Sequence, residues 1–286
     1  MKSRRIHALA VVTLLAASAA CDSATGPAAD PTARPEAIAE HHKLLGTITC
    51  HVDEVAGTTR CGELASASGA RATRVILNTS HFTLVTVGSF YNGGTQQHTF
   101  FNQIRNDIGQ AIGTHNGFTT DSIRAFVTAI NVTGGSGSIT ANNPTGTATF
   151  TAANQPYWEY REIVAPSDQS SSVTWIFNVP STVTAWSYTI GVSAPIQHPN
   201  GWIDVSGDTQ IPHSGAREHT AVVHTWTGAV DNSGSVSWSS TDEGGYVSVS
   251  SLDERVGYVL GVRLGYATVT ASKGSATPRT RTVEVY

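Results

Sequence analysis

The strongest constraint on the fold is the pattern of the segment from Val236 to Tyr286. Apolar and polar residues alternate there in short runs that read V-S-W-S-S-T-D, Y-V-S-V, G-V-R-L-G-Y-A-T-V-T-A and T-V-E-V-Y. Alternation with a period of two is typical of strands with one buried face. Clusters of Gly, Asp and Ser separate the runs and favour tight turns. The segment therefore predicts a series of short antiparallel strands.

This part of the chain resembles the bacterial immunoglobulin-like domain of group 2, a family found in bacterial surface proteins. The landmarks are Trp238 within V-S-W-S-S, the glycines Gly261 and Gly265, and the A-T-V-T-A strand that follows them. The resemblance covers about 202–286. It implies a sandwich domain with Trp238 in its core, and a non-catalytic role in adhesion, binding or spacing.

The chain departs from the family pattern in two places. Residues 242–246 read D-E-G-G-Y where the family has a small residue before the valine, and residues 252–255 form a longer turn. Both changes fall in surface loops, where binding residues are commonly found.

Strand signals also dominate the middle of the chain, from about Leu44 to Ala194. Seven or more short strands in such a length predict an antiparallel sandwich. Helical spacing of apolar residues within 101–112 is outweighed by Gly109 and the flanking strands, so a strand and a long loop are expected there. The expected strands are 46–52, 72–78, 82–90, 95–101, 123–132, 145–151, 172–179 and 183–192.

The start of the chain resembles an export signal. Residues 1–20 combine a basic beginning with an apolar stretch too short to span a bilayer comfortably. S-A-A-C then resembles a lipoprotein signal box, in which Cys21 would be acylated, although Ser18 stands where the family pattern favours Leu. Ordinary cleavage after the small residues before Cys21 is the alternative. Residues 21–43 would form a flexible tether, because they are rich in Ala, Pro and Thr.

Composition supports an exported β-rich protein and excludes one class of partner. Charged residues make up 13% of the chain, about half the usual share, and the net charge is −4. No basic cluster argues for nucleic acid. The membrane, through the lipid anchor, and a surface glycan or protein are the partners that remain.

If Cys21 carries lipid, Cys50 and Cys61 are the cysteines left, and an oxidising compartment favours a disulfide between them. A metal site is the alternative, because His41, His42 and His51 lie nearby in the sequence. The spacing of the two cysteines does not match a zinc ribbon, so no metal ligand and no cofactor is predicted.

Motifs for catalysis are missing from the sequence. There is no Gly-x-Ser-x-Gly elbow, no His-Glu-x-x-His and no Walker loop. A triad assembled from distant residues remains open, and with it a secreted hydrolase. Acidic turn residues could bind Ca²⁺ between domains, but solvated turns are the simpler interpretation. These residues are Asp204, Asp208, Asp231, Asp242, Glu243, Asp253 and Glu254.

The aromatic run P-Y-W-E-Y-R offers a possible ligand-binding surface. On a strand, Trp158 and Tyr160 share one face, while Tyr157 lies on the other with Glu159 and Arg161. If these rings are exposed, they would form a platform for sugars, extended by Trp175, Trp186 and Tyr188. A carbohydrate-binding module built on Tyr157, Trp158 and Tyr160 is therefore the alternative function, although aromatic residues in sandwiches are more often core.

The sequence as a whole predicts an all-β protein with two immunoglobulin-like antiparallel β-sandwich domains in tandem, after a signal peptide and flexible tether. The predicted boundaries are 1–20, 21–43, 44–197 and 198–286. The expected protein is a non-catalytic lipoprotein of the cell envelope or extracellular surface.

Overall fold

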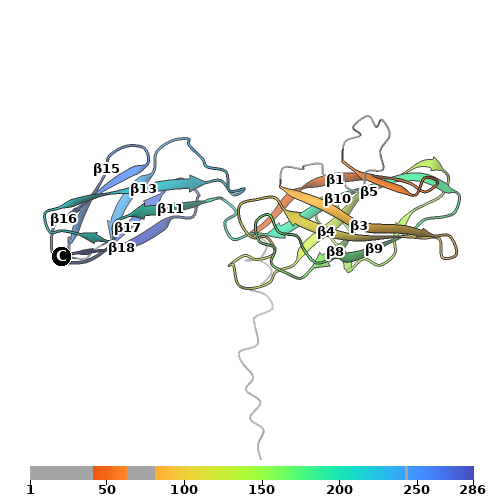
Figure 1. Ribbon diagram of the computed structural model, residues 1–286, viewed down its shortest axis with the longest axis horizontal. Coiled ribbons are helices and arrows are strands. Elements are labelled where there is room, and N and C mark those ends of the chain that lie inside the picture. The colour runs from red at the N-terminus through yellow and green to blue at the C-terminus, as the bar shows by residue number, and fades with distance from the viewer. Residues whose placement is uncertain (1–40, 63–80, 242–243) are drawn as a thin grey trace, which may run out of the picture.

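The computed structural model describes residues 41–62, 81–241 and 244–286. Figure 1 shows two β-sandwich domains placed end to end, with a short connection between them. No helix within the described ranges is long and apolar enough to cross a membrane. The prediction of an all-β protein with two antiparallel sandwiches is confirmed. The leader, Cys21 and most of the tether lie outside the described residues, as does the strand expected at 72–78.

The first domain has ten strands within the described residues, and they are numbered in the order in which they occur along the chain. The strands are β1 (His42–Asp53), β2 (Thr58–Cys61), β3 (Phe82–Asn92), β4 (Gln97–Asn106), β5 (Ile123–Gly135), β6 (Thr140–Ala141), β7 (Gly146–Ala148), β8 (Gln155–Tyr160), β9 (Val173–Asn178) and β10 (Val183–Pro195).

These strands form two facing sheets. One has the order β2-β1-β10-β5-β8-β7 and the other β3-β4-β9-β6. The first long strand pairs with the last, β4 pairs with β9, and β5 pairs with β8, all antiparallel. Such nested pairing is the winding of a jelly roll, in which a long hairpin is rolled into two Greek keys. Long-range pairing of β1 with β10 therefore closes the domain.

The second domain has eight strands within the described residues. They are β11 (Trp202–Gly207), β12 (Gln210–Ile211), β13 (Ala216–His224), β14 (Ser237–Thr241), β15 (Val247–Ser251), β16 (Val256–Gly261), β17 (Gly265–Ser272) and β18 (Arg279–Val285).

The strand order of the second domain is that of an immunoglobulin fold. One sheet has the order β11-β13-β16-β15 and the other β12-β18-β17-β14. Counted along the chain, this is the A-B-E-D sheet facing the G-F-C sheet, with β12 added in parallel to β18. Strand β16 was not among the strands expected from the sequence, which gave a turn at 252–255 and the next strand signal at Gly261.

The ambiguous segment 101–112 behaves as predicted. Strand β4 continues to Asn106, and an irregular loop follows it. In β4 the buried residues alternate with half-buried ones, so the strand has a core face and an outer face. The helical spacing of its apolar residues is overridden by pairing with β3 and β9.

Large rings fill the core of the first domain. Trp158 stacks on Trp175 with ring centroids 4.7 Å apart, and Phe177 contacts Trp158, Trp186 and Tyr188. All five are at most 1% exposed. Trp158 Nε1 donates to Asn143 Oδ1 over 3.0 Å, whereas Trp175 Nε1 and the Tyr188 hydroxyl are buried without a partner among the described residues.

The second domain has a smaller core of aliphatic side chains in two clusters. Ile211, Val259 and Val269 lie in one, and Ile203 and Val223 lie in the other. Trp238 packs against both clusters. It also lies against Gly257 of the facing sheet, so it takes the expected place between the sheets, although the ring is half-buried rather than fully buried.

Candidate functional site

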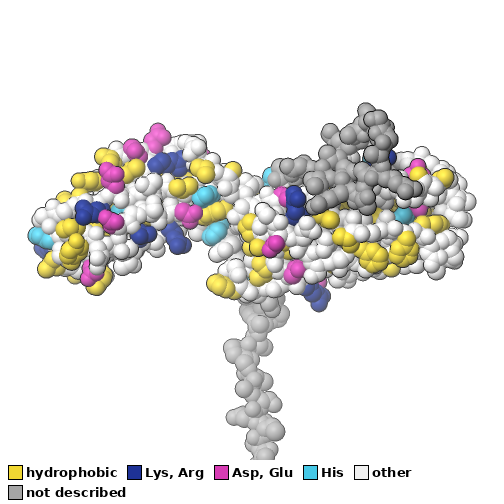
Figure 2. Space-filling model, in the orientation of Figure 1, with side chains coloured by type: hydrophobic (Ala, Val, Ile, Leu, Met, Phe, Trp, Pro, Cys, Tyr) yellow, Lys and Arg dark blue, Asp and Glu magenta, His cyan; other side chains and the backbone are white. Residues whose placement is uncertain are grey.

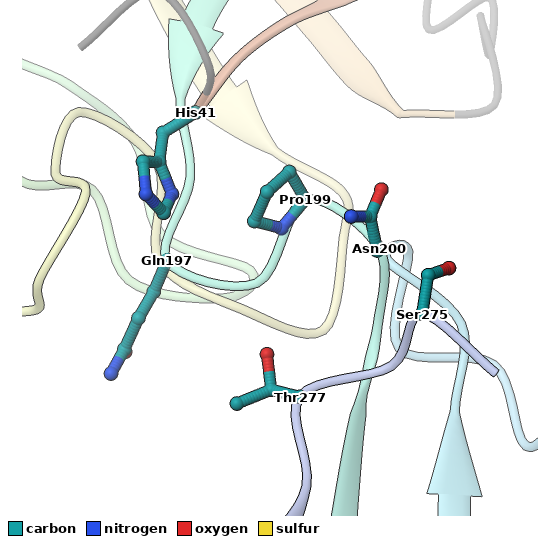
Figure 3. A pocket seen from close by; sticks show the side chains of 6 residues that line it. All are labelled: His41, Gln197, Pro199, Asn200, Ser275 and Thr277. Atoms are coloured by element: carbon teal, nitrogen blue, oxygen red, sulfur yellow. The ribbon is translucent and has the colours of Figure 1, made fainter. Parts of the chain in front are cut away.

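A groove at the junction of the two domains is the candidate site. It has a volume of about 450 Å³ and is lined by six side chains, shown in Figure 3 around an open space. The lining combines two amides, two hydroxyls, an imidazole and a pyrrolidine ring. The residues are His41, Gln197, Pro199, Asn200, Ser275 and Thr277.

The connection between the domains brings the two sides of this groove together. Strand β10 ends at Pro195, and Ile196 then exchanges hydrogen bonds with His41, through its backbone amide (3.0 Å) and its carbonyl (3.1 Å). On the other side, the backbone amide of Thr277 donates to the carbonyl of Gly201 over 2.9 Å. Through these hydrogen bonds, the linker holds both the start of β1 and the turn between β17 and β18 beside it.

Gly201 is required at this point. Its φ is +90°, and a Cβ there would lie 2.2 Å from the carbonyl oxygen of His224. Both the left-handed backbone and the close approach exclude other residue types. The chain can therefore turn sharply out of the linker and start β11 directly.

A second set of contacts joins the domains beside the groove. The Gln110 side chain donates to the carbonyls of Trp226 (2.6 Å) and His198 (3.1 Å) and accepts from the His198 amide (2.8 Å). Gly109 and Gly228 meet back to back, so that a Cβ on Gly109 would lie 2.9 Å from the Gly228 Cα. The junction is therefore closely packed and held by hydrogen bonds of a 7% exposed amide.

Histidines and tryptophans surround the same junction. Trp202 stacks on His224 with centroids 4.7 Å apart, and His224 Nε2 lies 3.1 Å from Asp204. His198 Nδ1 lies 3.2 Å from the Thr277 hydroxyl. Burial lowers the pKa of His198 and of His81, which packs edge-on against Trp226.

The predicted disulfide is present. Cys50 in β1 lies directly opposite Cys61 in β2, and the two sulfurs are bonded. The bond ties the edge strand β2 to the sheet. Both thiols of the alternative metal site are taken up by this bond, and no group of three or more His, Cys, Asp or Glu that could hold a metal ion occurs in the described residues. His41 and His42 instead contact the Ile196 carbonyl and the Ser193 hydroxyl.

The predicted sugar platform is wrong for its main residues. Trp158 and Tyr160 are each 1% exposed, and so cannot contact a ligand. The alternation along β8 is as expected, but the face that carries them packs into the core. Tyr157 on the other face is half-buried. The Arg124 guanidinium lies 5.2 Å from its ring centroid, and Phe150 packs edge-on against it at 5.7 Å. Trp175, Trp186 and Tyr188 are fully buried too.

Three of the acidic turn residues, Asp204, Asp208 and Asp231, form ion pairs. Asp231 pairs with Lys273 (2.8 Å), and Asp208 pairs with Arg217 (2.9 Å). The hydrogen bond from Lys273 holds the pKa of Asp231 well below its usual range. Asp242 and Glu243 lie outside the described residues.

Two partial catalytic arrangements occur, and neither is complete among the described residues. His42 contacts the Ser193 hydroxyl at 3.2 Å, but no carboxylate is hydrogen-bonded to this imidazole. His115 is paired with Asp121, but no hydroxyl contacts the ring. The buried pair of His98 and Glu54 (2.8 Å) lies within the sandwich, where Trp186 Nε1 also donates to Glu54. A triad needs nucleophile, base and orienting acid in one chain of contacts.

Surface charge offers no further site on the face seen in Figure 2. Basic and acidic side chains lie scattered over that face, without a continuous patch of either sign.

The predicted boundary between residues 197 and 198 falls at this connection, but the sequence reasoning missed the groove that the connection lines. Its clearest signal is P-I-Q-H-P-N-G, because amide and proline residues in a short linker place polar groups directly between two domains. The contribution of Ser275 and Thr277 has no comparable signal, since they are nearly eighty residues further along the chain.

Comparisons with known proteins do not assign this chain to a family. No family model matches the chain, and no curated protein matches it. Membership of the group 2 family therefore stays a prediction.

Two solved structures show distant likeness. One is a C-terminal 282-residue fragment of intimin in complex with the intimin-binding domain of its translocated receptor, at 12% identity and a TM-score of 0.23, with 74% of this chain and 64% of that fragment covered. The other is the polysaccharide lyase BACCELL_00875, at 8% identity and a TM-score of 0.22, with 84% and 39% covered. The chain thus spans less than two thirds of either structure.

Proposed function

We propose that this protein is an exported, lipid-anchored protein of the cell envelope, whose two sandwiches act together as a stiff stalk in binding or spacing at the surface. The observation that carries the proposal is the junction, where the domains meet end to end through direct hydrogen bonds (Figure 1). Domains joined by a flexible linker would move independently. Here the hydrogen bonds of the Gln110 amide and the Gly109–Gly228 contact hold the two domains in one relative orientation.

Export is supported by two independent features. The leader and Cys21 resemble a lipoprotein signal, apart from Ser18, and a disulfide between Cys50 and Cys61 is favoured in an oxidising compartment. A tether of about twenty residues would lift the stalk away from the bilayer. The several acyl chains of a bacterial lipoprotein would hold it firmly, whereas a single chain binds only marginally.

Replacing Cys21 tests the anchor. Cys21→Ser should release the protein from the membrane fraction, while Ser23→Ala in the same tether should not. Intact mass spectrometry of the parent protein should find lipid on Cys21. A membrane-bound Cys21→Ser variant, together with an unlipidated parent, would rule the anchor out.

Replacing Gly109 tests the stalk. Gly109→Ala places a methyl group against the Gly228 backbone and should loosen the junction, because backbone atoms cannot yield as a side chain can. Small-angle scattering should show a broader distribution of interdomain distances. Gly93→Ala is the control, since its Cβ would meet only the Tyr91 ring at 3.8 Å. A parent protein that is already flexible would contradict the stalk. A screen of the protein against glycans and matrix proteins would then test binding.

A further inference from the structure

The groove between the domains contains polar side chains that have no partner of their own. Gln197, Asn200 and Ser275 are all exposed, and their side chains form no hydrogen bond with any other described residue. Elsewhere at the junction, polar side chains such as Gln110 have their capacity filled. Donors and acceptors that line one groove without a partner in the described protein are free to bind a polar ligand.

The chemistry of the lining restricts that ligand. No Lys, Arg, Asp or Glu is among the six lining residues. Recognition of a phosphate or carboxylate would call for an Arg or Lys, and recognition of a cation would call for carboxylates. The amides of Gln197 and Asn200 each offer two donors and an acceptor, and the Ser275 hydroxyl offers both roles. Such groups match a ligand whose own groups both donate and accept, as hydroxyls do.

We propose that this groove binds a neutral carbohydrate, with the Gln197, Asn200 and Ser275 side chains as its hydrogen-bonding contacts. The proposal rests on the binding role proposed above and names its ligand class. A volume of about 450 Å³ lies in the range of small-ligand pockets and accommodates roughly one or two sugar rings. The half-buried Pro199 and the His41 ring supply flat surface for the apolar face of a sugar (Figure 3).

A neutral peptide is the competing ligand, and the lining disfavours it. Extended peptides bind by adding to an exposed strand edge, where the main chain supplies the hydrogen bonds. The groove is lined by the end of the tether, the linker and the turn between β17 and β18, all outside the named strands. Side chains therefore provide its polar contacts, as suits a ring of hydroxyl groups.

The site also depends on how the domains are held. His41 and Gln197 come from the side of the first domain, while Ser275 and Thr277 come from the second. A ligand that contacts both sides would stabilise the junction by binding only one arrangement of the two domains.

The experiment is a titration of the full-length protein with neutral oligosaccharides chosen from a glycan array. We expect binding to weaken roughly three- to tenfold in Asn200→Ala and in Ser275→Ala, the cost of one hydrogen bond each. Asn142→Ala and Ser239→Ala, at exposed positions in the first and second domains, are matched controls that should bind as the parent does. Because all four positions are exposed, folding should be preserved.

The outcomes separate this proposal from the proposed function. If no neutral glycan binds, or if the groove variants bind as tightly as their controls, the groove is not a carbohydrate site. Capture of a matrix protein in the same screen would then still support a surface-binding role. Binding of a neutral peptide that Asn200→Ala and Ser275→Ala abolish would also overturn the carbohydrate assignment. Failure of every ligand class would count against the binding role itself.

Discussion

The cores of the two sandwiches are filled by different kinds of side chain. The first domain fills its interior with rings, and Trp158, Trp175 and Trp186 are each at most 1% exposed. The second domain encloses aliphatic side chains such as Ile211 and Val259, and its Trp238 is only half-buried. One domain has a six-stranded sheet facing a four-stranded one, while the other has two sheets of four strands. The wider sandwich encloses more volume, and rings fill volume with the fewest side chains.

The difference in side chains brings a difference in polar requirements. Each buried Trp or Tyr has a polar tip, and the first domain supplies partners such as Glu54 for Trp186 and the Asn102 carbonyl for Tyr160. A buried polar group without a partner costs about 1–3 kcal/mol. In the second domain Trp238 Nε1 has no acceptor among the described residues. In the first domain Trp175 Nε1 and the Tyr188 hydroxyl also lack a partner, so the two cores differ in the size of their side chains more than in how fully their polar groups are paired.

The largest effect is expected for Trp158→Ala. It removes a ring stacked on Trp175 and one of the two hydrogen bonds that Asn143 Oδ1 accepts, so the first domain should lose about 3–5 kcal/mol of unfolding free energy. Chemical denaturation with two resolved transitions would measure it, and only the transition of the first domain should shift. The adjacent Tyr157→Ala is the control and should cost about 1 kcal/mol, because that ring is half-buried on the outer face. Equal costs would mean that Trp158 is not in the core.

Reduction of the disulfide should have the next largest effect. Opening the bond between Cys50 and Cys61 should destabilise the first domain by about 3 kcal/mol in the chain-entropy account, because the reduced unfolded chain gains freedom. The second domain carries no cysteine, so its melting temperature should not respond to reductant. Calorimetry with and without reductant would show it. A shift of both transitions would mean that the domains unfold as one unit.

Trp238→Ala should cost somewhat less, about 2–3 kcal/mol, because the ring is half-buried and one part of it already contacts solvent. The lost contacts are with both aliphatic clusters and with Gly257, where a Cβ would lie 2.4 Å from the ring. Trp238→Phe keeps most of the volume and should be tolerated better. Thermal unfolding of a fragment 202–286 would measure both. If Trp238→Ala melted within a degree or two of the parent fragment, the ring would not connect the two clusters.

Much of the fold follows from the sequence, because strand alternation is a local signal. Strands β3, β5, β9 and β10 lie where the apolar periodicity and the turn residues predict them. Strand β16 was missed because V-G-Y-V-L-G follows a long polar turn and runs into the next hairpin without a clear break. The jelly-roll winding could not be predicted, since it depends on the pairing of β1 with β10 across most of the domain.

The candidate site was less predictable than the fold. Periodicity showed that Trp158 and Tyr160 share a face, yet it could not say which face of β8 is buried. That choice is made by β9, whose Trp175 stacks on Trp158. The groove depends on a contact between the linker and the turn near Thr277, a relation of distant segments that no local pattern carries.

The smallest effect is a dependence of the second domain on pH. His219 on β13 is fully buried, and neither of its ring nitrogens has a partner of good geometry among the described residues. Burial lowers its pKa, and Arg281 adds to the effect, while the backbone groups of Asp208 and Arg217 and the Asp208 carboxylate oppose it. His219 therefore stays neutral in the folded domain at a pH where the unfolded chain binds a proton.

The sign follows from proton linkage. A free histidine titrates near pH 6.5, so below that pH the unfolded state holds more protons than the folded state, and stability falls as the pH is lowered towards the folded pKa. The slope for one proton is at most about 1.4 kcal/mol per pH unit. Unfolding of the fragment 202–286 between pH 7.5 and 5 would measure it. His219→Phe should flatten the curve, whereas His213→Gln, at an exposed position, should leave it unchanged. If His219→Phe kept the full slope, the proton would bind elsewhere and the buried imidazole would not be what makes this domain sensitive to acid.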